Sequence, residues 1–208
     1  MSESTSAAAG GYPVTYDIEP QITGRNRLTV AFRIILAIPH ALLVGAPGGS
    51  NWSGSSNVMG TVAFMMSIIS WFAIVLTGKQ PKGLWDFTSF YLRWRSRAVA
   101  YMALLRDEYP PFGEGDYPVR FGVGEFPETR DRLSVGLRLI YVIPHAVVLF
   151  FVGIAWLITA IIAWFAILFS GAYPEGLYRF GVGYLRWSLR VESYVLLMHD
   201  EYPPFSLA

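Results

Sequence analysis

The sequence predicts an α-helical integral membrane protein with four transmembrane helices in two tandem hairpins, and three observations support this fold class. The chain has 208 residues, of which 53% are hydrophobic and 15% are charged. An average soluble domain has about 25% charged residues. Residues 34–78 and 139–174 contain no Asp, Glu, Lys or Arg. Residues 12–112 recur as residues 113–208, so each repeat unit contributes one uncharged stretch.

The two units align with a change of offset inside the repeat. Tyr12-Pro13-Val14 and Ile38-Pro39-His40 recur 105 positions later, whereas the segment from Trp71 to Phe112 recurs 93 positions later. The offset falls by 12 because the first unit has an extra loop at Ala46–Asn57. Residues 1–11, which precede the first unit, are small and polar, and we expect a disordered tail there.

Each uncharged stretch has a length that suits a hairpin, because one spanning helix needs about 20 apolar residues. We predict hairpins at about residues 28–78 and 133–173. The first turns in the Gly- and Ser-rich loop at Ala46–Asn57, and the second is expected to turn near Phe151–Ala155. The second stretch is tight for two full spans. Either its first helix begins before Arg138, which then reaches the interface, or the hairpin crosses only in part.

The charged residues predict the orientation of the chain in the membrane. All Lys and Arg lie outside the two uncharged stretches. The positive-inside rule therefore places the N-terminus, the central segment and the C-terminus in the cytoplasm of a multi-pass protein.

An amphipathic helix is predicted after each hairpin, at about residues 82–106 and 175–199. Apolar residues recur there at alternating spacings of four and three, which is typical of one helix face. Arginines lie beside this stripe and a tryptophan lies within it, so we predict interfacial helices. The candidates for binding lipid headgroups are Arg93, Arg97, Arg186, Arg190, Trp94 and Trp187. The alternative is a helix of the same kind that merely stabilises its hairpin.

Short strands and acidic termini complete each unit. Residues 12–18 and 117–123 alternate apolar and polar side chains, which predicts two short cytoplasmic strands that could pair with each other. Each unit ends in Asp-Glu-Tyr-Pro-Pro-Phe, at 107–112 and 200–205. Acidic residues at a helix C-terminus oppose the helix dipole, so a nearby cation is expected. The candidates are Arg25, Arg27, Arg130 and Arg132.

The second unit resembles a known family. The resemblance is carried by Trp164-Phe165-Ala166-Ile167, Pro174-Glu175-Gly176-Leu177-Tyr178-Arg179 and Glu201-Tyr202-Pro203-Pro204-Phe205. These segments are similar to those of the DUF4389 family of bacterial membrane proteins, and residues 12–206 as a whole resemble its tandem form. The resemblance implies a protein of the bacterial plasma membrane with this architecture. It implies no activity and no catalytic residue.

His40 and His145 form a candidate intramembrane polar site, because each follows a proline within an uncharged stretch. They could approach each other to hold haem or a metal, or to relay protons. Alternatively, each could bond a carbonyl freed by the neighbouring proline. The chain has no cysteine and shows no metal-ligand or nucleophile motif. We therefore expect no metal site, no cofactor and no catalytic residue.

Three functions remain open at this point. The leading hypothesis is a non-catalytic membrane protein, an accessory or scaffold subunit or a lipid-interacting component of a membrane complex. Its expected partners are anionic lipids and either another protein or a second copy of the chain, but no nucleic acid. The alternative is an oligomeric transporter or channel component, with a pore lined by His40, His145, Ser67, Ser70 and Thr159. The third is a haem- or quinone-linked membrane subunit.

Overall fold

The computed structural model describes residues 11–47 and 57–208. The tail predicted at residues 1–11, apart from Gly11, and residues 48–56 of the predicted loop lie outside the described residues. The elements in chain order are β1 (Thr15–Ile18), α1 (Arg27–Ala31), α2 (Arg33–Val44), α3 (Val58–Thr77), α4 (Lys82–Met102), β2 (Val119–Gly122), α5 (Arg132–Ser170) and α6 (Glu175–Val195).

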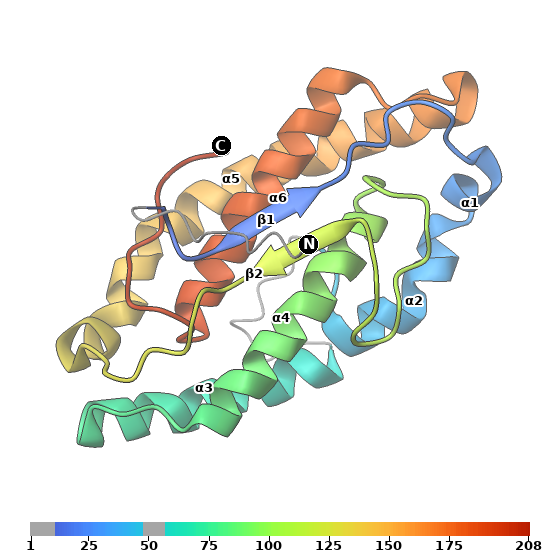
Figure 1. The fold of residues 1–208 in the computed structure, drawn as a ribbon. Coiled ribbons are helices and arrows are strands. Elements are labelled where there is room, and N and C mark those ends of the chain that lie inside the picture. Colours follow the sequence, from blue (N-terminus) through green and yellow to red (C-terminus); the bar gives the residue numbers. More distant parts are fainter. Residues whose placement is uncertain (1–10, 48–56) are drawn as a thin grey trace, which may run out of the picture.

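The elements are stacked in three layers (Figure 1). Strands β1 and β2 form a ribbon that packs on α4 and α6, which make up the middle layer. On their other side, α4 packs against α2 and α3, and α6 packs against α5. Helices α1, α2, α3 and α5 therefore form a single outer layer, which we call the outer helical layer. Both helices that follow the uncharged stretches are consequently enclosed by protein.

The ribbon fixes the symmetry that relates the two units. The two strands predicted from the alternating patterns pair with each other; they are antiparallel, and Tyr16 lies opposite Phe121. These two residues occupy the same position of the repeat, because the first unit is offset by 105 residues here. A pseudo-twofold axis therefore passes between them, perpendicular to the ribbon and to the layers beneath it.

The predicted turn near Phe151–Ala155 is wrong, because α5 is one continuous helix of 39 residues. At 1.5 Å per residue it is about 58 Å long, roughly twice the hydrocarbon thickness of a bilayer. The first unit carries the same helix in broken form, as α1 and α2 followed by α3. The break coincides with the extra loop, where Gly45 ends α2 and the Asn57 side chain accepts a hydrogen bond from the Gly60 N–H at 2.7 Å to begin α3.

Within the described residues, α3 and α5 are the two helices that are long and apolar enough to cross a membrane. The predicted set of four transmembrane helices is thus reduced to two candidates. The hydropathy pattern located the apolar segments correctly, but it could not show whether each segment folds back on itself as a hairpin. The run from Phe150 to Trp156 contains one residue that disfavours a helix, Gly153. A helix tolerates such a glycine at a cost of about 1 kcal/mol.

The predicted membrane-interface placement of the two amphipathic helices is also wrong. Their apolar stripes are buried inside the protein, with Tyr91 and Ala98 of α4 at 0% exposure. An apolar stripe at helical spacing is satisfied equally well by protein and by lipid. The sequence pattern therefore predicted the helix and its buried face correctly. It was wrong about what covers that face, which is protein and not lipid.

The two units share one core. The largest cluster of buried side chains joins Tyr16 and Val30 of the first unit to Trp156 and Leu185 of the second. Equivalent hydrogen bonds tie the ends of the outer layer together. Trp71 Nε1 donates to the Val135 carbonyl and Trp164 Nε1 donates to the Val30 carbonyl, both at 3.0 Å. The chain is consequently one interlocked domain, and neither unit is closed by itself.

Candidate functional site

The outer helical layer exposes a large apolar face. Only 11% of the most apolar 18-residue window of α5 is buried, whereas the core helix of a soluble protein would be mostly buried. The exposed side chains of α5 are large and lie along its whole length: Leu133, Leu139, Ile143, Val147, Phe150, Ile154, Leu157, Ile161, Phe165 and Phe169. Apolar patches of more than a few hundred Å² mark a membrane or protein interaction. This face is therefore a candidate surface for contact with a membrane or another protein.

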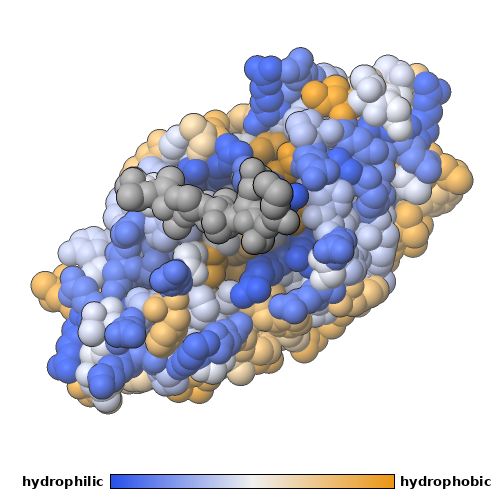
Figure 2. Space-filling model, in the orientation of Figure 1, coloured by the Kyte–Doolittle hydropathy of each residue, from blue (hydrophilic) through white to orange (hydrophobic). Residues whose placement is uncertain are grey.

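The opposite face of the molecule, which carries the ribbon, is polar. Figure 2 shows it as mostly hydrophilic, with hydrophobic side chains gathered toward the rim. The exposed pair of Arg120 and Glu19 lies there, with 83% and 65% of the side chains accessible. The protein is therefore amphipathic as a whole, along the direction of its pseudo-twofold axis.

Two buried clusters of charge, one in each unit, lie where the outer layer meets the middle layer. We call them the arginine clusters. In the first, Asp107 accepts hydrogen bonds from Arg25 at 2.7 and 3.0 Å and from Arg33 at 2.7 Å. In the second, Asp200 accepts bonds from Arg130 at 2.7 Å and from Arg138 at 2.8 Å. Arg25 and Arg130 are thus the partners that the sequence predicted for the acidic helix ends.

The other two candidates, Arg27 and Arg132, lie elsewhere. Their side chains pack against Gly171 and Gly78, at the ends of α5 and α3. Sequence reasoning missed Arg33 and Arg138 as partners of these carboxylates; it considered Arg138 only as a residue that could reach the membrane interface. Both are 2% exposed, and they stack over the rings of Tyr101 and Tyr194 at 3.9 and 4.2 Å. The signal in the sequence that could have revealed their role is that they occupy the same position in the two units.

The clusters hold two leucines in a strained conformation. Leu104 and Leu197 have φ angles of 63° and 62°, in the left-handed region that residues other than glycine rarely adopt. Each follows the end of its helix, and its carbonyl accepts a hydrogen bond from an arginine: Leu104 from Arg25 at 2.6 Å, Leu197 from Arg130 at 2.7 Å. Each arginine therefore satisfies a helix-end carbonyl as well as a carboxylate.

The carboxylates of both clusters are ionised at neutral pH. Burial raises the pKa of Asp107, but the hydrogen bond from Arg25, the Asn26 N–H and the charges of Arg25 and Arg33 outweigh it, so that pKa is lowered overall. The pKa of Asp200 is lowered in the same way, because hydrogen bonds and charges from Arg130 and Arg138 outweigh the effect of burial. Because two guanidinium groups share each carboxylate, each set of three residues carries one excess positive charge.

His199 adds no charge to the second cluster. It is the counterpart of Arg106, and burial together with Arg138 and Arg130 lowers its pKa to about 3. Its ring nitrogen instead lies 3.2 Å from the Tyr12 hydroxyl. The second cluster therefore keeps one excess positive charge, to which its neutral histidine adds none.

The two predicted intramembrane histidines are each enclosed by aromatic side chains of their own unit. Trp94 Nε1 donates to His40 Nδ1 at 3.2 Å, and Trp187 Nε1 donates to His145 Nδ1 at 3.1 Å. The His40 ring stacks on Phe112 and the His145 ring stacks on Phe205.

His40 Nε2 bonds the Pro110 carbonyl at 3.2 Å, which is not the carbonyl freed by its neighbouring Pro39. Both His40 nitrogens are thus engaged within the protein. Among the described residues, no group of three or more His, Asp and Glu side chains is placed to hold a metal ion.

The predicted headgroup-binding arginines lie on the side of α4 and α6 that carries the ribbon. Arg186 donates to the Tyr16 carbonyl of β1 at 3.2 Å, and Arg190 lies over the Tyr12 ring. Arg97 donates to the Gly113 carbonyl at 3.3 Å, and Arg93 is 3.8 Å from Glu114. Trp94 and Trp187 are buried against the histidines on the other side. The structure thus separates the residues that the sequence grouped into one headgroup site.

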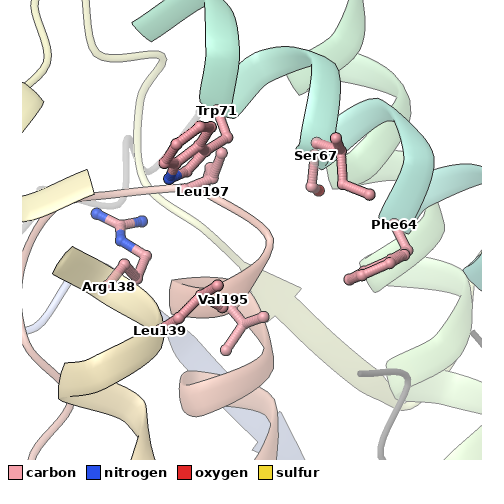
Figure 3. A pocket seen from close by; sticks show the side chains of 8 residues that line it. Phe64, Ser67, Trp71, Arg138, Leu139, Val195 and Leu197 are labelled. Carbon is pink, nitrogen blue, oxygen red and sulfur yellow. The ribbon is translucent and has the colours of Figure 1, made fainter. Parts of the chain in front are cut away.

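A groove of about 250 Å³ opens between α3, the start of α5 and the end of α6 (Figure 3). It is lined by Phe64, Ser67, Ile68, Trp71, Arg138, Leu139, Val195 and Leu197. Figure 3 shows Arg138 beside Trp71 and Leu197 at one end and Phe64 at the other. The groove thus joins the apolar face to the second arginine cluster.

The fold and these sites define a tandem-repeat helical protein with two candidate membrane-spanning helices and a short two-stranded sheet. The family model described as "Domain of unknown function (DUF4389)" matches residues 54–113 and 132–206. The chain therefore belongs to the DUF4389 family, in a form with two tandem units. No curated protein and no solved structure gives a significant match.

Proposed function

We propose that the protein is a monotopic membrane protein, a scaffold whose outer helical layer lies within one leaflet and whose ribbon face lies in water. The observation that carries this proposal is the continuous apolar face of α1, α2, α3 and α5, opposite a polar face. A helix is about 10 Å across and one leaflet has about 15 Å of hydrocarbon, so a single layer of helices fits within it.

A crossing arrangement is less favourable on electrostatic grounds. The ribbon lies level with the middle of α5 (Figure 1). If α5 crossed the bilayer, the ribbon and its exposed charged residues, such as Arg120 and Asp17, would lie near the bilayer centre. Each charge there costs about 2.5–3.5 kcal/mol. With α5 parallel to the membrane plane, these side chains remain in water.

The predicted cytoplasmic orientation is compatible with this placement. The first described residues and the C-terminal segment lie together, since Tyr12 contacts His199. The polar face, with both of these segments, would then face the cytoplasm, as the positive-inside rule favours. This face is available to another subunit, which retains the scaffold role predicted from the sequence.

The absence of cysteine allows a direct test. Glu128→Cys and Glu175→Cys place single thiols just before α5 and at the start of α6, close to the two ends of α5. In sealed membrane vesicles, a membrane-impermeant maleimide should label both thiols from the same side, together with Arg120→Cys in the ribbon. Ile154→Cys, on the apolar face, should react only after the vesicles are dissolved in detergent.

The opposite outcome supports the transporter or channel alternative. If Glu128→Cys and Glu175→Cys are labelled from opposite sides, then α5 crosses the bilayer and the monotopic proposal is wrong. The monotopic proposal also requires that the purified protein float with phosphatidylcholine vesicles in a density gradient. A protein that stays at the bottom of the gradient has no membrane-binding layer.

A further inference from the structure

We infer that the groove between α3, α5 and α6 binds a fatty acid, with its acyl chain along the apolar walls and its carboxylate at Arg138. This inference rests on the proposed membrane placement, because that placement brings acyl chains to the mouth of the groove. It adds a ligand and a site to that proposal.

The walls of the groove are continuous with the apolar face. Ile68 and Leu139 line the groove. Both are also exposed on the outer layer, Ile68 to 39% and Leu139 to 66% of its surface. A chain can therefore enter from the leaflet without passing through water. The volume of about 250 Å³ is below the range of about 300–1,000 Å³ that is usual for drug-sized ligands. Such a groove suits one acyl chain better than a two-chain lipid.

Arg138 supplies the polar end of the site. Its Nη1 donates to the Tyr194 carbonyl and its Nη2 to Asp200, both at 2.8 Å. Its Nε is buried and has no hydrogen-bond partner among the described residues, as is also the case for the Arg33 Nε in the first unit. Leaving a buried donor unsatisfied costs about 1–3 kcal/mol. A carboxylate that accepts from Nε would satisfy this donor with a charge-assisted bond.

Charge complementarity favours an acid over a neutral lipid. Among the described residues, Asp200 is the carboxylate that forms ion pairs with Arg130 and Arg138. The one excess positive charge is matched by one carboxylate. A compact carboxylate also reaches a single buried N–H more readily than the bulkier phosphodiester of a phospholipid does.

The first unit provides a matched control position. At the equivalent position beside the first arginine cluster, Met102 stands in place of Val195, and Ala160 of the second unit stands in place of Ser67. Met102 is longer than valine and packs against both large core clusters. We therefore expect one fatty-acid site per chain, in the second arginine cluster.

The test uses the full chain in phosphatidylcholine nanodiscs with a diazirine-bearing stearic acid, followed by light and peptide mass spectrometry. The adducts should concentrate on groove residues, and excess oleate should remove them. Methyl oleate and phosphatidylglycerol should compete at least tenfold more weakly. Ile68→Trp should lower the groove adducts at least tenfold, whereas the repeat-equivalent Ile161→Trp should leave them unchanged.

Three results would overturn the inference: adducts spread evenly along the outer layer, methyl oleate or phosphatidylglycerol competing as well as oleate, or Ile68→Trp without effect. Normal insertion of the protein into nanodiscs together with any of these results removes the fatty-acid site and leaves the monotopic proposal intact. Failure to insert removes the monotopic proposal itself.

Discussion

The Arg95 guanidinium and the Glu192 carboxylate form an ion pair of 2.8 Å across the two units, and the repeat does not duplicate it. Their counterparts are Ser188 and Val99. Arg95 also donates to the carbonyl of Val44, the last residue of α2, where the outer helix of the first unit is broken. In α5 the helix continues through the equivalent position, so its own N–H groups bond that carbonyl. Arg95 thus compensates for the break.

Removing one partner of this pair should destabilise the protein strongly. Arg95→Ser leaves Glu192 without this partner in a largely buried position, and we expect a loss of about 3–5 kcal/mol in the free energy of unfolding. The double variant Arg95→Ser with Glu192→Val, which installs the counterpart residues, should lose less. Denaturant unfolding followed by tryptophan fluorescence measures both. Lys82→Ser, which breaks an exposed pair, is the control and should cost less than about 1 kcal/mol. A double variant less stable than the single would contradict this account.

Acid should destabilise the fold through Asp107 and Asp200. Their pKa values are lowered in the folded state, so the unfolded chain binds more protons as the pH falls. Their stabilisation is complete above the unfolded pKa of about 3.9 and is lost as the pH drops through the folded pKa values. Unfolding curves between pH 7 and pH 2 should show this decline. Asp107→Asn should flatten this decline.

The Trp–His hydrogen bonds should contribute equally in the two units. Trp94→Phe and Trp187→Phe each leave a buried imidazole nitrogen without its donor, at a cost of about 1–3 kcal/mol. Thermal unfolding of the two variants should give similar shifts. Because both His40 nitrogens are engaged within the protein, His40 should not ligate haem and should give rise to no Soret band. Such a band that disappeared in His40→Ala would support the haem alternative instead.

Two glycines of α5 should respond to alanine in opposite ways. A Cβ at Gly136 meets nothing within 4 Å, so Gly136→Ala should raise the free energy of unfolding by up to about 1 kcal/mol. A Cβ at Gly153 would lie 3.0 Å from the Tyr184 hydroxyl, whose ring stacks on Trp156. Gly153→Ala should therefore gain nothing or lose stability. Equal gains from both variants would show that Tyr184 moves freely.

Several features could be predicted because they depend on local pattern. The alternation at residues 12–18 and 117–123 predicted the ribbon, and the acidic ends of the units predicted cation partners, two of which are Arg25 and Arg130. The roles of Arg33 and Arg138 could not be predicted, because their partners are more than 60 residues away in sequence. The groove could not be predicted either, because it is formed by three helices whose packing no local pattern encodes.

The sequence by itself determined the duplication, the two short strands, the positions of the apolar segments and the apolar stripes of α4 and α6. The tertiary structure decided what covers each of these surfaces. The physical reason is that hydropathy measures the avoidance of water, which burial in protein and burial in lipid satisfy alike. The pattern therefore placed α4 and α6 at a membrane, whereas packing encloses them and leaves α5, unbroken and apolar, as the surface that still needs a partner.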